Sequence, residues 1–76
     1  MVDTAVLRGL LAQNGFSQAE MAKNLGMTPK TFYTKMKKKV FDSDEIDIMI
    51  KILNIKDPIS VFFAEIVTWQ VTIQKS

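Results

Sequence analysis

The stretch FSQAEMAKNLGMTPKTFYTKMKKK, residues 16–39, decides the fold of this chain. It contains two short apolar patterns, a Gly-Met-Thr-Pro break between them and a run of lysines at its end. Ser17 followed by Glu20 is a capping box, which predicts that a helix starts at this point. Gly26 ends that helix, because glycine readily takes the positive φ that a tight turn requires. The first half of the stretch is therefore a short helix with a local signal at each end.

A second helix follows almost at once. Thr28 is a suitable N-cap, and Pro29 fits the first helical position, where its missing N–H is no loss. We expect this helix to run to about Lys38, with Phe32 and Met36 on the side that packs in the core. A turn of about three residues between two helices is typical of a helix-turn-helix motif.

The opposite side of this second helix is polar. Its residues follow the i, i+3, i+4, i+7 spacing and so share one face: Lys30, Tyr33, Thr34 and Lys37. Such side chains reach base edges in a major groove. The lysine run 37–39 suits phosphates, and it also suits the negative end of the helix dipole. Tyr33 has two interpretations: it contacts a base or a phosphate, or it is a half-buried side chain that packs beside Phe32.

Helical signals also precede the stretch. Asp3 or Thr4 is expected to cap an earlier helix, and Gly15 is expected to close it. The apolar positions of this helix recur with helical spacing: Val6, Leu7, Leu10 and Leu11. The signals up to residue 39 are all helical, which predicts an all-α fold for this part of the chain.

Two more helices are predicted after the stretch. Ser43 is expected to cap the fourth, and Asp57 with Pro58 is expected to start a short fifth. The expected inward residues are Ile46, Met49, Ile50 and Leu53 in the fourth helix, and Ile59, Phe62, Phe63 and Ile66 in the fifth. The prediction is a five-helix, all-α domain over residues 1–66.

The end of the chain changes period. In residues 67–76 apolar side chains alternate with polar ones, which predicts a C-terminal β-strand: Val67, Trp69, Val71 and Ile73. No other segment looks like its partner, and a lone strand leaves its N–H and C=O groups unpaired. We expect it to pair with the same strand of a second copy and so to form a homodimer interface. The competing interpretation is that the tail folds back on its own domain or binds another protein.

Composition excludes several classes of function. The chain has 76 residues, no Cys and no His, so the commonest metal ligands and the commonest general base are absent. We therefore expect no enzyme, no cofactor and no metal site, and a protein of the cytoplasm. The net charge is only +2, but six lysines lie in residues 17–40 against a single acidic residue, and six acidic residues lie in residues 41–66. This asymmetry indicates an anionic partner for the basic half.

The segment SQAEMAKNLGMTPKTFYTKM resembles the helix-turn-helix of the Cro and phage-repressor family, often called XRE-like. The resemblance rests on Gln18, Ala22, Gly26 and Phe32, and the five-helix order over roughly residues 4–66 is similar too. It implies that Gln18 contacts a phosphate and braces the reading helix. It also implies that Thr28, Lys30, Tyr33 and Thr34 read bases. Pro29 departs from the family pattern, since several members carry a polar base-reading residue there.

The resulting hypothesis is a sequence-specific transcriptional regulator that binds double-stranded DNA at an inverted-repeat operator. The candidate DNA-binding residues are Gln18, Thr28, Lys30, Thr31, Tyr33, Thr34, Lys37, Lys38 and Lys39. The alternative is an antirepressor or modulator that acts by binding another repressor, for which the acidic second half and the strand-like tail would serve.

Overall fold

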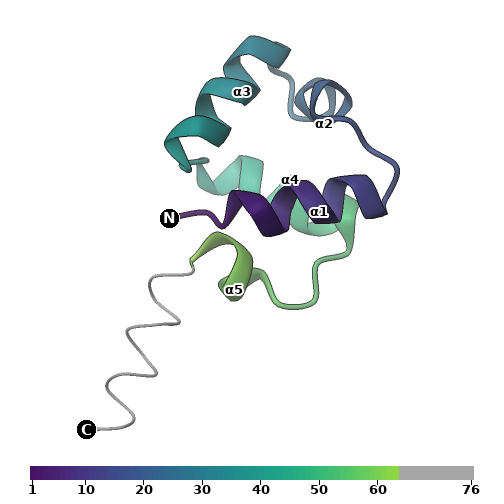
Figure 1. The fold of residues 1–76 in the computed structure, drawn as a ribbon, viewed down its shortest axis with the longest axis vertical. Coiled ribbons are helices and arrows are strands. Elements are labelled where there is room, and N and C mark those ends of the chain that lie inside the picture. Colours follow the sequence, from purple (N-terminus) through teal and green to yellow (C-terminus); the bar gives the residue numbers. More distant parts are fainter. Residues whose placement is uncertain (64–76) are drawn as a thin grey trace, which may run out of the picture.

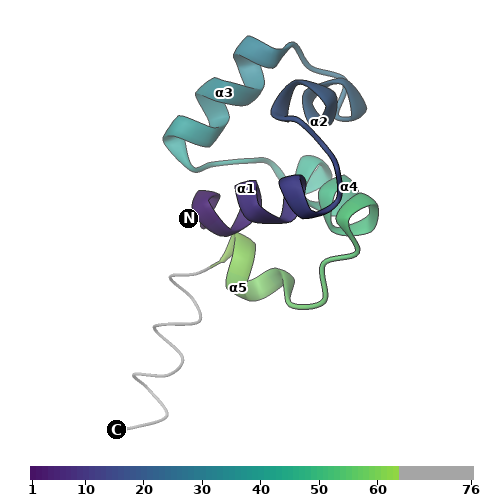
Figure 2. The same cartoon turned by 45° about the vertical axis from the view of Figure 1, so that its right-hand side comes forward.

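The computed structural model describes residues 1–63, and these residues form five helices. They are α1 (Thr4–Gln13), α2 (Gln18–Asn24), α3 (Pro29–Lys38), α4 (Ser43–Leu53) and α5 (Pro58–Phe62). Figures 1 and 2 show α2 and α3 on one side of α1 and α5 on the other side. The all-helical prediction is confirmed for residues 1–63, whereas the strand predicted at 67–76 lies outside the described residues. None of the helices in this described part has the length and hydropathy needed to cross a membrane.

The first helix begins and ends as its local signals predict. Of the two proposed caps Asp3 is the one used, since its carboxylate accepts the backbone N–H of Val6 at 3.2 Å. Thr4 is buried instead, with 5% of its surface exposed. Gly15 has a φ of +77°, the left-handed conformation expected just after a helix.

The capping box at the start of α2 is complete. The Ser17 hydroxyl accepts the backbone N–H of Glu20, and the Glu20 carboxylate accepts the backbone N–H of Ser17, both at 3.0 Å. The hydrogen bond from the Ser17 backbone lowers the pKa of Glu20. Because the charged carboxylate is the better acceptor, this cap favours the folded state above the ordinary pKa of a glutamate. The stabilisation that the Glu20 carboxylate gives to the folded state is lost as the pH falls through its lowered pKa.

The turn between α2 and α3 also follows the prediction. Gly26 has a φ of +72°, and the Thr28 hydroxyl accepts the backbone N–H of Thr31 at 3.2 Å. Pro29 occupies the first helical position of α3. The helix-turn-helix geometry is therefore encoded in a few consecutive residues.

The cap of α4 differs from the prediction. Asp42, and not Ser43, is the N-cap, and Ser43 is the first residue of the helix. The reason is a second capping box, in which Asp42 accepts the N–H of Glu45 at 3.0 Å and Glu45 accepts the N–H of Asp42 at 2.9 Å. A cap at Ser43 would place Ile46 at the third helical position, where no carboxylate returns the hydrogen bond.

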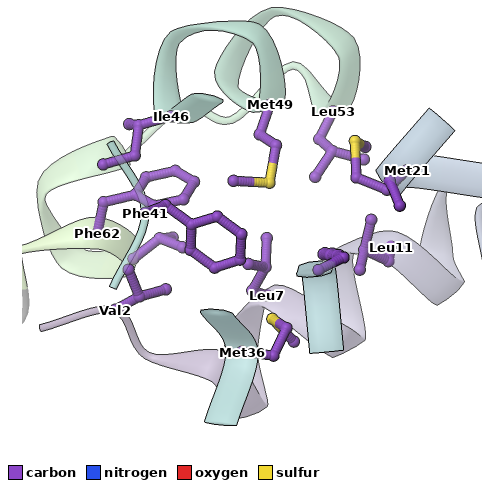
Figure 3. Close-up of a cluster of buried hydrophobic side chains, with 13 residues drawn as sticks. Val2, Leu7, Leu11, Met21, Met36, Phe41, Ile46, Met49, Leu53 and Phe62 are labelled. Atoms are coloured by element: carbon purple, nitrogen blue, oxygen red, sulfur yellow. The ribbon is translucent and has the colours of Figure 1, made fainter. Parts of the chain in front are cut away.

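The core lies where all five helices meet. Figure 3 shows its side chains gathered from the N-terminal segment, the helices and the segment between α3 and α4. The buried apolar residues are Val2, Leu7, Leu11, Met21, Ala22, Phe32, Met36, Phe41, Ile46, Met49, Leu53, Val61 and Phe62. Phe32 and Phe41 pack edge to face, with ring centroids 5.4 Å apart. The core thus holds α3 by the side opposite its polar residues.

The predicted inward face of α5 is right at one of its three described residues, and the fourth, Ile66, lies outside the described residues. Phe62 is buried, with 1% exposed, but Ile59 and Phe63 are 48% and 40% exposed, and Val61 is buried in their place. The helix has five residues, too few for helical periodicity to fix its orientation. Its orientation is instead linked to a contact between distant segments, the hydrogen bond of 2.7 Å from the Asp3 backbone N–H to the Val61 carbonyl.

Candidate nucleic-acid interface

The helix-turn-helix is built on three buried side chains. Met21 and Ala22 of α2 and Phe32 of α3 have no exposed surface. Ala22 has only a methyl group, so the helix that follows can approach closely. Its carbonyl also accepts the backbone N–H of Met27 at 3.0 Å, which helps to fix the turn. The position of α3 relative to α2 is therefore set by packing and by the turn together.

The face of α3 opposite Phe32 and Met36 is exposed, as predicted. We call its four residues the polar face of α3: Lys30, Tyr33, Thr34 and Lys37. Tyr33 is 49% exposed, although its neighbour Phe32 is fully buried. About half of the tyrosine surface is therefore open to a partner, and its contact with DNA stays a prediction.

The Thr34 hydroxyl has a defined role within α3. It donates a hydrogen bond of 3.0 Å to the carbonyl of Lys30, one turn earlier. The proton of the hydroxyl is thereby engaged, and its oxygen lone pairs point away from that bond. In this arrangement Thr34 offers an acceptor to a partner, for example to the amino group of adenine or cytosine.

The lysines of α3 are of two kinds. Lys35 forms ion pairs with Glu45 at 2.5 Å and with Asp42 at 3.9 Å, which lie at the start of α4. Within residues 1–63 no carboxylate pairs with the other cations of the helix and its cap: Lys30, Lys37, Lys38 and Lys39. The pairing of Lys35 was not predicted, because its partners lie seven and ten residues away, at the N-cap and in the first turn of α4.

Lys39 leaves the helix in an unusual conformation. It is the C-cap of α3 with φ 60° and ψ 35°, in the left-handed region that glycine normally occupies. Its backbone N–H bonds to the Met36 carbonyl at 3.2 Å, and its own carbonyl accepts the N–H of Val2 at 3.0 Å. The last cation of the run is therefore fixed by the backbone and tied to the N-terminal segment.

The remaining candidates lie on the flanks of α3. Gln18 is in the first turn of α2, partly exposed, and its side chain forms no hydrogen bond within the described residues. The hydroxyls of Thr28 and Thr31 lie 2.9 Å apart, so these two residues bond to each other at the start of α3. The expected brace from Gln18 to α3 is thus not formed within residues 1–63, and its phosphate contact stays a prediction.

A surface hollow of about 510 Å³ runs along one flank of α3. It brings Thr31 and Lys38 together with Lys30 and Thr34 of the polar face. Val40, 61% exposed, lines the same hollow, and it was not among the predicted residues. The hollow therefore combines cations and hydroxyls with apolar side chains, a mixture that suits sugars and thymine methyl groups, while Asp42, paired with Lys35, makes its far wall acidic.

One comparison with known proteins agrees with this geometry. The family model described as bacterial regulatory protein, Fis family, matches residues 1–38, which span α1, α2 and α3. No curated protein and no solved structure matches the chain. The prediction of a helix-turn-helix DNA-binding domain is confirmed, whereas the resemblance to the Cro and phage-repressor family stays a prediction. Since the match covers half of the chain and includes the whole helix-turn-helix, this protein belongs to the Fis family of bacterial regulatory proteins.

Proposed function

We propose that this protein regulates transcription in the cytoplasm by binding a specific operator in double-stranded DNA through α3. The observation that carries the proposal is the placement of charge on that helix. Lys30, Lys37, Lys38 and Lys39 are exposed and have no carboxylate partner within residues 1–63. The buried residues Phe32 and Met36 hold the helix by its other side. An α-helix with this division of residues fits the width of a major groove.

The candidate residues take different roles in this proposal. Lys30, Tyr33 and Thr34 read base edges, while Thr28 and Thr31 adjoin the groove from the start of α3. Gln18 and the lysine run 37–39 bind phosphates, which set the register of the protein on the duplex. The helix-turn-helix of the Fis family supports DNA as the partner, and the assignment of each residue is our proposal.

A titration tests the function directly. DNA from the gene's own locus and mixed-sequence DNA are each titrated with the protein from low to moderate salt. For a protein that binds DNA in this way, log K falls steeply and linearly with log salt concentration, since the phosphates that it binds release their counterions. A locus fragment bound more tightly than mixed-sequence DNA supports an operator. The absence of salt-dependent binding to either DNA contradicts the proposal.

Lys30→Ala tests the reading of bases. If Lys30 binds a guanine edge, the variant should lose about 1–3 kcal/mol of specific binding and keep its affinity for mixed-sequence DNA nearly unchanged. The fold should be retained, because Lys30 is exposed and alanine favours a helix. The measurement is a footprint and a titration at one salt concentration. Lys56→Ala, which removes a lysine after α4, is the control, and an unchanged footprint for Lys30→Ala would remove this residue from the reading set.

We further propose a homodimer that binds an inverted repeat, as in Cro-like repressors. Residues 1–66 form the DNA-binding part and residues 67–76 form a strand that pairs with its copy through Val67, Trp69, Val71 and Ile73. Ile59 at the start of α5 and Phe63 just after its end are apolar and about half exposed, and they offer a surface for the paired strands to cover. Two α3 helices related by a two-fold axis meet successive major grooves about 34 Å apart.

Deletion of residues 67–76 tests the dimer. The full-length chain should sediment as a dimer at tens of micromolar, and the truncated chain should sediment as a monomer. The truncated chain should also bind a single half-site with the affinity of one subunit, because its helix-turn-helix is untouched. A full-length chain that is a monomer at this concentration, or a truncated chain that dimerises equally well, would contradict the strand-mediated dimer.

A second candidate function rests on the acidic surface of the other half. Asp44 and Asp47 are exposed on α4, and Asp57 is exposed at the start of α5. Such a surface suits a basic protein partner, as expected for an antirepressor or modulator that binds another repressor. The titration described above separates the two, since a pure protein binder shows little affinity for DNA at low salt.

A further inference from the structure

A second hollow, of about 540 Å³, lies between the N-terminal end of α1 and the C-terminal end of α3. Three cationic side chains from two helices line it: Arg8 on α1, and Lys37 and Lys39 at the end of α3. We call these three residues the α1–α3 cation cluster. Figure 1 shows the same closeness, with the start of α1 beside the end of α3. The cluster adjoins the polar face of α3 through Lys37 and extends it toward α1.

Asp3, the one acidic residue that lines this hollow, is engaged elsewhere. It caps α1, since its carboxylate accepts the backbone N–H of Val6 at 3.2 Å. No ion pair joins it to a cation within residues 1–63. Arg8 is exposed, so its guanidinium is open to a partner from solution. The charge in the hollow is therefore predominantly positive and not neutralised by the surrounding described side chains.

The two walls of the hollow are held together by the backbone. The N–H of Val2 donates to the carbonyl of Lys39 at 3.0 Å, which joins the two walls. The N–H of Asp3 donates to the carbonyl of Val61 on α5 at 2.7 Å, which anchors the N-terminal wall to the domain. Val2 is also buried, with 4% exposed. Arg8 lies one helical turn after Thr4, which lines the same hollow, so both project from one side of α1. The cations are thus carried on anchored backbone, which lowers the entropy lost when they bind an anion together.

We propose that the α1–α3 cation cluster binds one phosphate of the DNA backbone beside the groove that α3 enters. This inference rests on the proposed function. The guanidinium of Arg8 offers two parallel N–H donors that match two phosphate oxygens, and Lys37 and Lys39 supply further charge from the opposite wall. The contact makes α1 part of the interface. It also fixes the angle of α3 in the groove, because a phosphate held from two helices resists rotation of the domain.

DNA is the occupant that fits the position of the cluster. A free phosphate or another small anion would find the same cations, but Lys37 also belongs to the polar face of α3, which is proposed to lie in the groove. A phosphate in the hollow is therefore continuous with the contacts that the lysine run 37–39 makes. The experiment therefore measures binding of DNA and, separately, NMR shifts caused by inorganic phosphate.

The test uses the full chain with Arg8→Gln, its conservative partner Arg8→Lys, and Lys56→Gln as a charge-matched control. Lys56 lines a different hollow, between α1 and the segment that follows α4. The slope of log K against log salt should fall by about 0.9 in Arg8→Gln, recover in Arg8→Lys and stay unchanged in Lys56→Gln. Ethylation interference should show one phosphate that matters to the unaltered chain and not to Arg8→Gln. Equal melting temperatures show that the variants are folded.

The outcomes separate the two levels of the proposal. If the unaltered chain binds DNA and Arg8→Gln matches Lys56→Gln in slope and interference pattern, the cluster is not a phosphate site and the proposed function stands. If the unaltered chain binds no DNA, both proposals are overturned. If Arg8→Gln abolishes NMR shifts caused by inorganic phosphate while the DNA slope is unaffected, the cluster takes a free anion and the DNA contact is overturned.

Discussion

Phe32→Ala is expected to lower the free energy of unfolding by about 3–5 kcal/mol, because it leaves a large cavity in the core. The ring is fully buried and packs edge to face on Phe41, 5.4 Å away between centroids. A domain of this size has a free energy of unfolding of only roughly 4–11 kcal/mol. The variant should therefore melt at least about 12 °C lower, and much of it should be unfolded at 37 °C. Thermal unfolding followed by circular dichroism measures the loss.

Tyr33→Ala is the matched control for this prediction. It removes an aromatic ring from the next position of α3, where the side chain is 49% exposed. Its effect on stability should stay within about 0.5 kcal/mol, as for most surface substitutions. A Phe32→Ala variant that melts within a degree or two of the unaltered chain would show that Phe32 does not anchor α3 to the core.

Replacing Lys37, Lys38 and Lys39 together with glutamine is expected to have the largest effect on DNA binding. All three are exposed, and none forms an ion pair within the described residues. The slope of log K against log salt should fall by about 0.9 for each phosphate contact that is lost with these lysines. Affinity for specific and for mixed-sequence DNA should fall by similar factors, because phosphates carry no sequence information. Titrations at four or more salt concentrations give the slopes.

The double variant Lys51→Gln with Lys56→Gln removes two positive charges, against three in the triple variant, and controls for most of the change in net charge. These lysines lie on α4 and in the segment after it, and the slope should hardly change when they are lost. Glutamine at residue 39 also keeps a side chain in the left-handed conformation, so the C-cap of α3 is no more strained than before. A loss confined to specific binding would mean that the lysine run reads sequence, contrary to its proposed role.

The helix boundaries of residues 4–38 were predictable because their signals are local. The capping box of Ser17 and Glu20 and the positive φ of Gly26 each depend on residues within one helical turn. The same logic placed the cap of α4 one residue late. Ser43 and Asp42 are both good caps, and the choice depends on which of them has a carboxylate at the third helical position.

Features that depend on distant contacts were not predictable in this way. The orientation of α5 goes with a hydrogen bond between Asp3 and Val61, so periodicity alone misplaced Ile59 and Phe63. The candidate site shows the same division. Spacing along one helix identified the exposed polar face of α3, whereas only the folded chain separates the paired Lys35 from the lysine run 37–39 and brings Arg8 beside it.

The left-handed conformation of Lys39 places two requirements on a single residue. Glycine or asparagine would end α3 there with less strain, since each tolerates a φ of 60° better than lysine does. The chain instead carries a side chain that ends the helix less comfortably and adds a third consecutive positive charge. At residue 39 thermal stability and attraction to a polyanion are therefore opposed. A glycine or asparagine there should raise the first and lower the second.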